Sequence, residues 1–287
     1  MSSATPHGTS QSLERAAAFF DLDKTIIARA SLAAFRAPLH ENGLLSFSGI
    51  ARSLAGQLIY LHLGTKDARI ERFSESLLPL AAGWRQAEVE EIVEATLERV
   101  VDPIIYAEAI ELIELHRAAG DLVVIVSAAP VEIVVPLGRH LGVDDVIATE
   151  AELDEEGRYT GRIARYLHGA HKAEAVRAFA TARHIDLDRS FAYGDAASDV
   201  PMLELVGHPV AVNPDRSLAR TAASEGWEIT HFERPMRLRE RVGVARPTPL
   251  VVSASSLVAG AGVVTVAWWL RRRHGARRAP APKVEAL

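Results

Sequence analysis

The stretch AAAFFDLDKT, residues 16–25, decides the fold of this chain. Its first half, Ala16 to Phe20, is a short run of apolar residues, and its second half turns abruptly to the acids Asp21 and Asp23. An apolar run of this length without polar alternation is typical of a parallel strand that is buried on both faces. The sequence therefore predicts a buried strand whose carboxyl end carries two carboxylates.

Further short apolar runs recur along the chain, separated by stretches with helical spacing. We expect these runs to be strands at Leu122–Val126, Val146–Thr149, Ser190–Tyr193 and Pro209–Val212, the last of these being the last strand. Strands that alternate with helices imply an α/β fold, a doubly wound parallel sheet with helices on both faces. Ligands of such sheets bind outside the carboxyl ends of the strands. Polar residues follow three of the runs there: Asp21 and Asp23, then Ser127, then Asp195.

Several helices can be placed from spacing and punctuation. Residues 31–111 interrupt the alternation with helical patterns such as Ala87–Val101, and we expect them to form an inserted cap. Pro103 suits the first turn of a helix that runs to Ala119 and stops at Gly120. A turn signal at residues 154–157 predicts a β-hairpin between Glu152 and Tyr159, and residues 171–184 read as a helix.

Composition excludes several classes of function. The chain has 287 residues and no cysteine, which rules out disulfides, thiolate metal sites and cysteine nucleophiles. Residues 1–246 hold 26 basic and 36 acidic residues, so this part of the chain is a poor candidate for binding nucleic acid. Residues 1–11 are rich in Ser and Thr and lack the apolar core of a signal peptide.

The C-terminal part differs from the rest. Residues 248–270 are 23 positions without a charge, closed by Trp268 and Trp269 and then by three arginines. As a helix this segment would span about 35 Å, enough for a hydrocarbon core of about 30 Å, although a buried C-terminal helix is the alternative. Arginines on both flanks leave the orientation undecided by charge, but a single late span favours a cell-membrane tail anchor with the body in the cytoplasm. We expect the organisation to be a disordered tail over 1–16, a catalytic domain over 17–235 (core 17–30 and 112–235, cap 31–111), a basic linker over 236–247, a transmembrane helix over 248–270 and a basic tail over 271–287.

The acids have a chemical reading and a structural one. Two carboxylates one residue apart at a strand end repel each other unless a cation such as Mg²⁺ relieves them. Taken singly, however, an Asp-x-Asp pair, a serine after a strand, a lysine and an acidic loop are each compatible with caps, turns or solvated surface. Their order along the chain carries more information than any one of them.

Asp21-x-Asp23-x-Thr25, then Ser127, then Lys172, then Gly194-Asp195-x-x-x-Asp199 resembles the four-motif signature of haloacid dehalogenase-like hydrolases. The gap of 106 positions between Asp21 and Ser127 resembles the phosphoserine phosphatase-like subfamily IB group, which has a helical cap there. The resemblance covers about residues 17–230.

The resemblance implies a magnesium-dependent phosphomonoester hydrolase acting on a small phosphorylated substrate. By it, Asp21 forms an aspartyl-phosphate and Asp23 protonates the leaving oxygen and then activates water. Mg²⁺ would be held by Asp21, the Asp23 carbonyl and Asp195, while Ser127 and Lys172 would bind the phosphoryl group. Asp199 and Thr25 would not bind the metal or the substrate directly but would contact the residues that do.

Departures from the group's pattern limit the substrate. Residues 26–31, IIARAS, lack the glutamate that recognises the serine amine, the cap reads FSESLLPL at 73–80, and Ser198 stands where asparagine is usual. These departures argue against phosphoserine as the substrate. A phosphotransferase using the same intermediate and a non-catalytic, membrane-tethered regulator are the alternatives, and the sequence gives no information on the oligomeric state.

Overall fold

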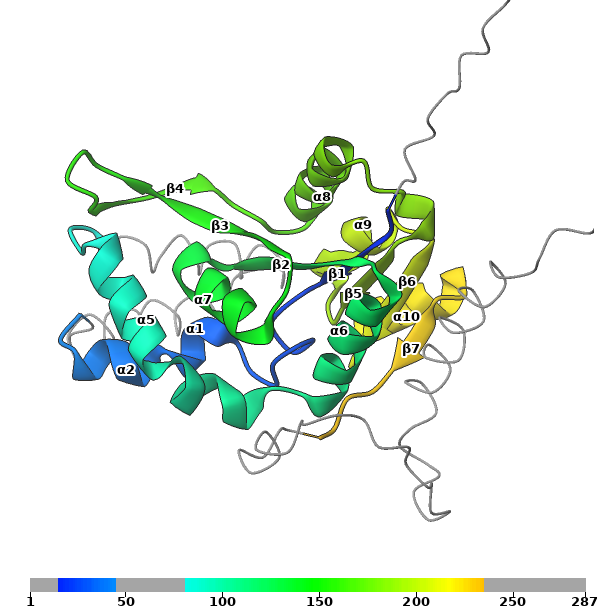
Figure 1. Cartoon of the computed structure of the whole chain (residues 1–287), viewed down its shortest axis with the longest axis horizontal. Coiled ribbons are helices and arrows are strands. Elements are labelled where there is room, and N and C mark those ends of the chain that lie inside the picture. The colour runs from blue at the N-terminus through cyan, green and yellow to red at the C-terminus, as the bar shows by residue number, and fades with distance from the viewer. Residues whose placement is uncertain (1–14, 45–80, 235–287) are drawn as a thin grey trace, which may run out of the picture.

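A computed structural model describes residues 15–44 and 81–234 of the chain. A seven-stranded sheet in the order β4-β3-β2-β1-β5-β6-β7 runs through this part of the molecule (Figure 1). Neighbouring strands are parallel except for β3 and β4, which are antiparallel. The strands are β1 Ala17–Phe20, β2 Leu122–Pro130, β3 Asp145–Leu153, β4 Tyr159–Arg165, β5 Phe191–Gly194, β6 His208–Val212 and β7 Glu228–Thr230.

Strand β1 lies in the middle of the sheet, and its four residues are all buried. Side chains alternate across a strand, so Ala18 and Phe20 enter one hydrophobic cluster, whereas Ala17 and Phe19 enter a second one on the opposite face. The strand therefore needs no polar face, which is why its sequence is a continuous apolar run.

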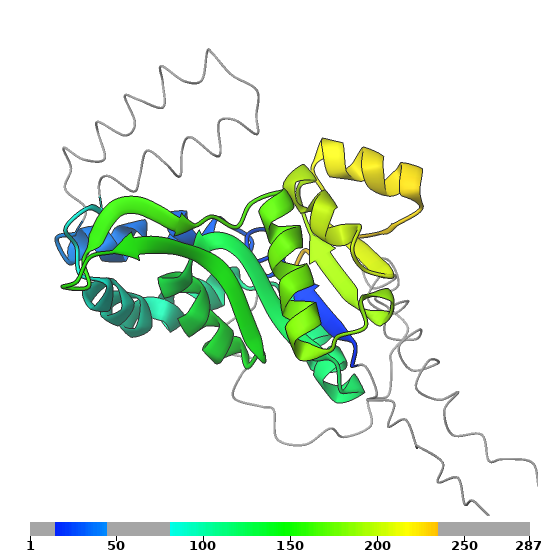
Figure 2. The same cartoon turned by 90° about the horizontal axis from the view of Figure 1, so that it is seen from above.

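Helices cover both faces of the sheet (Figure 2). The cluster around Phe20 contains residues of α2, α5, α6 and α7, and the cluster around Phe19 contains residues of α8, α9 and α10. Because α2 and α5 share the cluster that covers the sheet, these two helices pack as a continuation of the core. The helices are α1 Ser31–Ala34, α2 Arg36–Glu41, α5 Gln86–Val101, α6 Ala107–Ala119, α7 Val131–Leu141, α8 Ala170–Arg183, α9 Val200–Leu203 and α10 Arg216–Glu225, with short 3-10 turns at Asp102–Ile104, Leu187–Arg189 and Ala197–Asp199.

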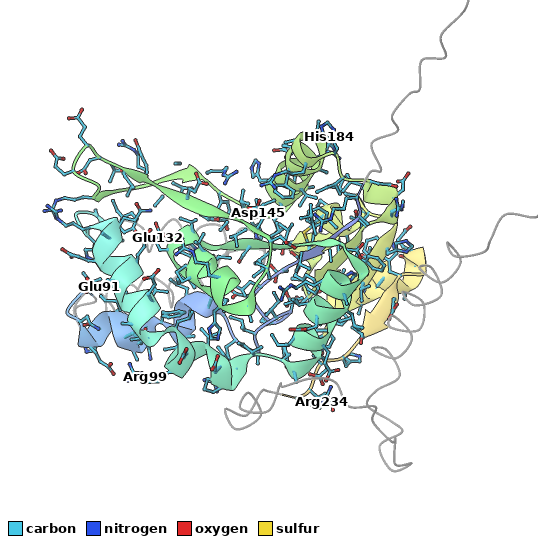
Figure 3. All side chains as sticks on the ribbon, in the orientation of Figure 1. Glu91, Arg99, Glu132, Asp145, His184 and Arg234 are labelled. Atoms are coloured by element: carbon cyan, nitrogen blue, oxygen red, sulfur yellow. The ribbon has the colours of Figure 1, made fainter. Side chains whose placement is uncertain are left out.

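The region between α5, α7 and the β3–β4 hairpin shows how these helices are joined to the core. Gln86 of α5 donates a hydrogen bond of 3.0 Å from Nε2 to Glu132 Oε1 of α7. Figure 3 places the buried Glu132 between these two helices, while Glu91 and Arg99 on α5 lie at the surface. A backbone bridge between Arg85 and Arg158 ties the start of α5 to the hairpin.

The α/β class, the mostly parallel sheet and the β3–β4 hairpin are confirmed. Two predictions about elements are wrong. Pro103 does not begin the helix that ends at Ala119; it lies in a 3-10 turn, the chain becomes extended at Ile105 and Tyr106, and α6 starts only at Ala107. Residues 209–212 are not the last strand, because the three-residue β7 follows and pairs with β6.

Within residues 15–44 and 81–234, no helix is long and apolar enough to cross a membrane. The predicted transmembrane helix at 248–270, the basic linker and tail around it, nearly all of the predicted N-terminal tail and the middle of the predicted cap lie outside the described residues.

Candidate active site

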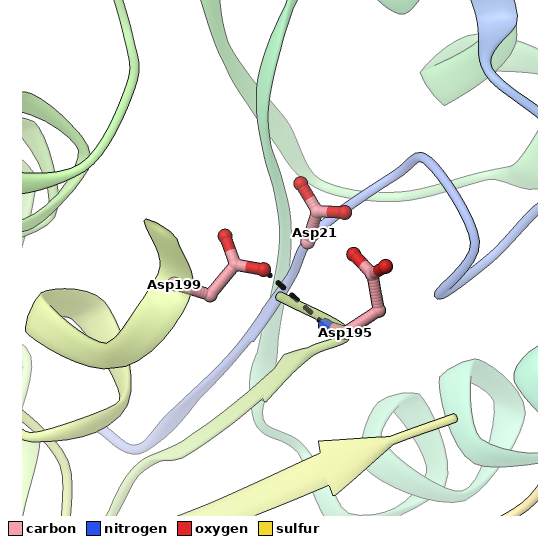
Figure 4. A group of neighbouring side chains, drawn as sticks. All are labelled: Asp21, Asp195 and Asp199. Atoms are coloured by element: carbon pink, nitrogen blue, oxygen red, sulfur yellow. Dashed lines mark hydrogen bonds between the residues drawn. The ribbon is translucent and has the colours of Figure 1, made fainter. Parts of the chain in front are cut away.

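Carboxylates from two neighbouring strand ends meet at one edge of the sheet. Asp21 follows β1 directly, Asp195 follows β5 directly, and Asp199 lies in the 3-10 turn four residues later (Figure 4). One ligand atom from each of the three lies within 4.8 Å of the others, and all three side chains are buried. The pairing of β1 with β5 brings them together, and it is extended by a hydrogen bond of 2.8 Å from Asp21 N to Tyr193 O.

Lys172 is the cation at the centre of this cluster. It lies on the first turn of α8, and its side chain is only 3% exposed. Its Nζ donates to Asp21 Oδ1 at 2.5 Å and to Asp199 Oδ1 at 2.7 Å. Burial lowers the pKa of Lys172, but the carboxylates of Asp199 and Asp21 reverse this and raise it overall, so the ammonium stays charged.

Asp199 fixes the loop rather than facing outward. Its Oδ2 accepts hydrogen bonds from the backbone N–H of Asp195 and of Ala196, both at 3.2 Å, while Oδ1 binds Lys172. Gly194 makes this closure possible, because a Cβ at that position would lie 2.6 Å from Asp199 Cβ. The Gly-Asp-x-x-x-Asp spacing thus has a steric reason: the loop folds back on the residue that begins it.

The nearby lysines do not fully compensate the negative charge of the clustered carboxylates. Burial, reinforced by Asp199, raises the pKa of Asp195 to about 7, although Lys24 and Lys172 pull it down. Burial also raises the pKa of Asp21. The positive charge of Lys172 lowers this pKa in part, and the negative charges of Asp199, Asp195 and Asp23 raise it further. A bound cation would relieve this strain, and carboxylate oxygens are the ligands that Mg²⁺ takes.

Asp23 lies apart from the three clustered carboxylates. It belongs to a tight turn that follows β1, in which Ile26 N and Ile27 N both donate to Leu22 O. Asp23 Oδ1 accepts a hydrogen bond of 2.8 Å from Ser31 N. Burial raises the pKa of Asp23, and the Ser31 amide lowers it again in part.

Ser127 and Thr25 are less directly connected to the cluster. Ile125 pairs with Phe20, so Ser127 continues β2 along the same sheet edge as Asp21. The Ser127 hydroxyl is buried and accepts a hydrogen bond of 3.1 Å from Ala129 N. Thr25 is buried beneath the turn, and its hydroxyl has no hydrogen-bond partner among the described residues. A phosphate-binding role for Ser127 and a supporting role for Thr25 stay predictions.

Two contacts at this edge were not foreseen from the sequence. Lys24 Nζ lies 3.7 Å from Asp195 Oδ2. The backbone of Lys24 has a φ of 63°, in the left-handed region. The Ser31 amide reaches back across eight residues to Asp23. The Lys24 contact could have been suspected from a lysine between motif residues, but a backbone amide leaves no signal in a sequence.

Comparisons with known proteins agree with this geometry. The family model for haloacid dehalogenase-like hydrolases matches residues 18–204, a range that includes all the residues of the cluster. The chain belongs to this family.

The relatives of this haloacid dehalogenase-like hydrolase include named phosphatases. A Streptomyces azureus protein named "Inhibition of morphological differentiation protein" is 43% identical over 265 residues, which cover 92% of this chain and 96% of that protein. A Mycobacterium tuberculosis protein named "Probable phosphatase" is 42% identical over 261 residues, or 90% of each chain. Another from that organism, named a phosphoserine phosphatase, is 33% identical over 246 residues, 85% of this chain and 79% of that one.

A solved structure is also similar. The structure of a protein with unknown function from Bordetella pertussis Tohama I has a TM-score of 0.65 and 30% identity, and covers 75% of this chain and 98% of its own. The family match and the named relatives make the chain a phosphatase of the haloacid dehalogenase type, similar to the phosphoserine phosphatase group, and the solved structure shares its fold.

Proposed function

We propose that this hydrolase is a magnesium-dependent phosphomonoesterase that works through an aspartyl-phosphate on Asp21. The observation that supports this best is the placement of Asp21. It is buried at the strand end, bonded to a charged lysine and beside two more carboxylates. A carboxylate held in this way is both fixed in position and surrounded by groups that can bind a metal ion and a phosphoryl group.

The reaction would proceed in two displacements. First, an Asp21 oxygen attacks phosphorus, the bond from phosphorus to the leaving oxygen breaks, and Asp23 gives its proton to that oxygen, releasing the alcohol. Then Asp23, now a carboxylate, takes a proton from water as the water oxygen attacks phosphorus. The bond to Asp21 breaks, and inorganic phosphate leaves. Lys172 offsets negative charge on the phosphoryl oxygens in both steps.

The residues present fit Mg²⁺. Asp21, Asp195 and Asp199 converge, and Asp199 is already engaged by two amides and Lys172, which leaves Asp21 and Asp195 as the direct carboxylate ligands with the Asp23 carbonyl as a third. When bound there, Mg²⁺ would neutralise the carboxylates and the substrate phosphate together.

Replacement of Asp21 by Asn tests the mechanism. The variant should lose phosphatase activity on p-nitrophenyl phosphate while its circular dichroism stays that of the wild type, and Asp188→Asn, at an exposed carboxylate, serves as the control. Borohydride reduction of the wild-type enzyme during turnover should convert Asp21 to homoserine, detected by peptide mass spectrometry. Turnover by Asp21→Asn would exclude the mechanism.

We propose further that the substrate is a phosphomonoester other than phosphoserine. The turn and first cap residues, Lys24 to Ser31, contain no acid that could bind the serine amine. A screen of phosphorylated metabolites and lipid phosphates should therefore find a substrate hydrolysed with a higher kcat/KM than phosphoserine. Analysis of products in the presence of alcohol acceptors separates a hydrolase from a phosphotransferase.

We also propose that the catalytic domain over 17–235 is tethered to the cell membrane through residues 248–270 and faces the cytoplasm. The support is the 23-residue uncharged stretch with its terminal tryptophans. Fractionation of the full-length chain should recover it with membranes, and deletion of 248–287 should release it. Recovery of the full-length chain in the soluble fraction would refute the tether.

A further inference from the structure

The backbone amide of Ser31 makes a contact that the proposed mechanism does not yet use. Ser31 is the first residue of α1 and is fully buried, and its N–H donates to Asp23 Oδ1 at 2.8 Å. Asp23 is the residue that must deliver and recover a proton in the two displacements. The contact therefore joins the first residue of the helices inserted after β1 to the acid–base carboxylate.

The chain between the two residues is held in place by backbone hydrogen bonds. Ala28 N donates to Ile104 O at 2.7 Å, and Tyr106 N donates to Ile26 O at 2.9 Å. An antiparallel bridge joins Ile27 to Ile105 between them. These bonds tie the outgoing chain to the returning chain just before Ser31. The Ser31 amide that binds Asp23 therefore follows a stretch of chain, residues 26–28, that is hydrogen-bonded to residues 104–106.

An amide N–H can only donate, so an oxygen bound to it must act as an acceptor. The hydroxyl oxygen of a neutral carboxyl is a weaker acceptor than its carbonyl oxygen, so the bond from Ser31 to Oδ1 favours the proton of a neutral Asp23 on Oδ2. We propose that the Ser31 backbone amide is a positioning group for the acid–base step: it fixes the Asp23 carboxyl and leaves Oδ2 as the oxygen that transfers the proton. This inference rests on the proposed function, in which Asp23 protonates the leaving oxygen.

Ser31→Pro removes this single N–H with little demand on the backbone. Proline is favoured at the first position of a helix, and the preceding residue must be extended. Ala30 meets that condition, with φ of −62° and ψ of 124°. Ser31→Ala is the matched control, because it removes the hydroxyl and keeps the amide. A second variant carries lactic acid at position 31, which replaces the N–H by an ester oxygen without a ring and differs from Ser31→Ala in that one atom.

The readout compares two substrates of similar shape. Phenyl phosphate has a poor leaving group that needs a proton, whereas p-nitrophenyl phosphate has a good one that does not. The kcat/KM value reports steps up to the first irreversible one, which is phosphoryl transfer to Asp21. We expect Ser31→Pro and the ester variant to lose at least about tenfold more kcat/KM on phenyl phosphate than on p-nitrophenyl phosphate, because positioned general acids contribute about 100-fold or more. Ser31→Ala shows how much of any change comes from the hydroxyl, which also lowers the pKa of Asp23, and its ratio is the reference for the ester variant.

An equal loss on both substrates, or an unchanged ratio, in a folded variant overturns the inference. If Ser31→Pro fails to fold, the ester variant decides alone, since it adds no ring. The result is separate from that for Asp21: activity retained in Asp21→Asn removes the proposed function, whereas an inactive Asp21→Asn with an unchanged substrate ratio at position 31 removes only the role of the amide.

Discussion

Asp195 should make the metal-free protein less stable as the pH rises. Its pKa is raised from an ordinary 3.8 to about 7, first by burial and then by Asp199. Between these two values the folded protein still holds the proton that the unfolded chain has already lost. Folding therefore binds a proton in this window, and stability falls with increasing pH until it levels off above pH 7.

The size of the effect follows from the shift. A rise of about three pKa units at about 1.4 kcal/mol each corresponds to roughly 4 kcal/mol of lost stability above pH 7. At pH 5 only about one unit of the shift has acted, so roughly 3 kcal/mol should be lost between pH 5 and pH 8. Asp195→Asn removes the titrating group and keeps its shape. In EDTA, the stability of this variant relative to the wild type should therefore rise by roughly 3 kcal/mol over the same interval.

Urea unfolding in EDTA at several pH values measures this difference. Asp188→Asn, at an exposed carboxylate on the 3-10 turn before β5, provides the control and should show no such trend. With Mg²⁺ the wild type should be more stable than Asp195→Asn, because metal binding stabilises the wild type and the variant lacks one of the ligands. A pH-independent difference between Asp195→Asn and the wild type in EDTA would refute the claim that Asp195 is buried without sufficient positive charge.

Three other changes test separate features. Lys172→Met leaves Asp21 and Asp199 buried without their cation, so the unfolding free energy in EDTA at neutral pH should fall by about 3–5 kcal/mol. Lys24→Met, at a lysine that is 64% exposed, should change it by less than about 1 kcal/mol, and equal effects of the two in urea titrations would contradict the central role of Lys172. Gly194→Ala forces Asp199 away, since the new Cβ would lie 2.6 Å from Asp199 Cβ. Its kcat should fall at least about tenfold, and wild-type kinetics would show that the loop can relax. His116→Leu breaks hydrogen bonds of 2.9 Å to Asp121 and 2.8 Å to Tyr193. It should lower the free energy of unfolding measured in urea by about 2–6 kcal/mol, because it leaves two buried polar groups unpaired at about 1–3 kcal/mol each, and by more than Tyr193→Phe, which leaves one.

The parts of the fold that were predictable are those in which local sequence and burial agree. Residues 16–20 and 122–126 are apolar because both faces of the central strands are covered, so a simple run indicates the strand. The helix start predicted at Pro103 is wrong for a local reason. Proline does favour a helical first turn, but Ile105 is extended because its backbone pairs with Ile27 in a bridge. Strand β7 has three residues, Glu-Ile-Thr, too few for any periodicity to register.

The candidate site divides in the same way. That Asp21 and Asp195 meet at one sheet edge could be predicted, because carboxyl ends of neighbouring parallel strands adjoin and both acids follow apolar runs. The contact of Lys172 with Asp199 was also predicted, and the hydrogen bond of 2.7 Å between them confirms it. That Lys172 donates to Asp21 as well could not be predicted, since this depends on how far α8 is displaced from the strands before its first turn. A spacing in sequence does not contain that distance.

The charge balance of the cluster links its structure to its chemistry. When all three buried carboxylates are ionised, they face one buried ammonium and one exposed ammonium, so the site then carries net negative charge in a medium that solvates charge poorly. A phosphate dianion could not enter such a site unaided, because like charges repel strongly at this depth. A divalent cation at Asp21 and Asp195 would turn the balance positive and make the same cluster attract the substrate. Order of binding follows from this: the metal should precede the phosphate. Phosphate affinity measured by calorimetry should accordingly appear only after Mg²⁺ is added, whereas Mg²⁺ should bind without phosphate.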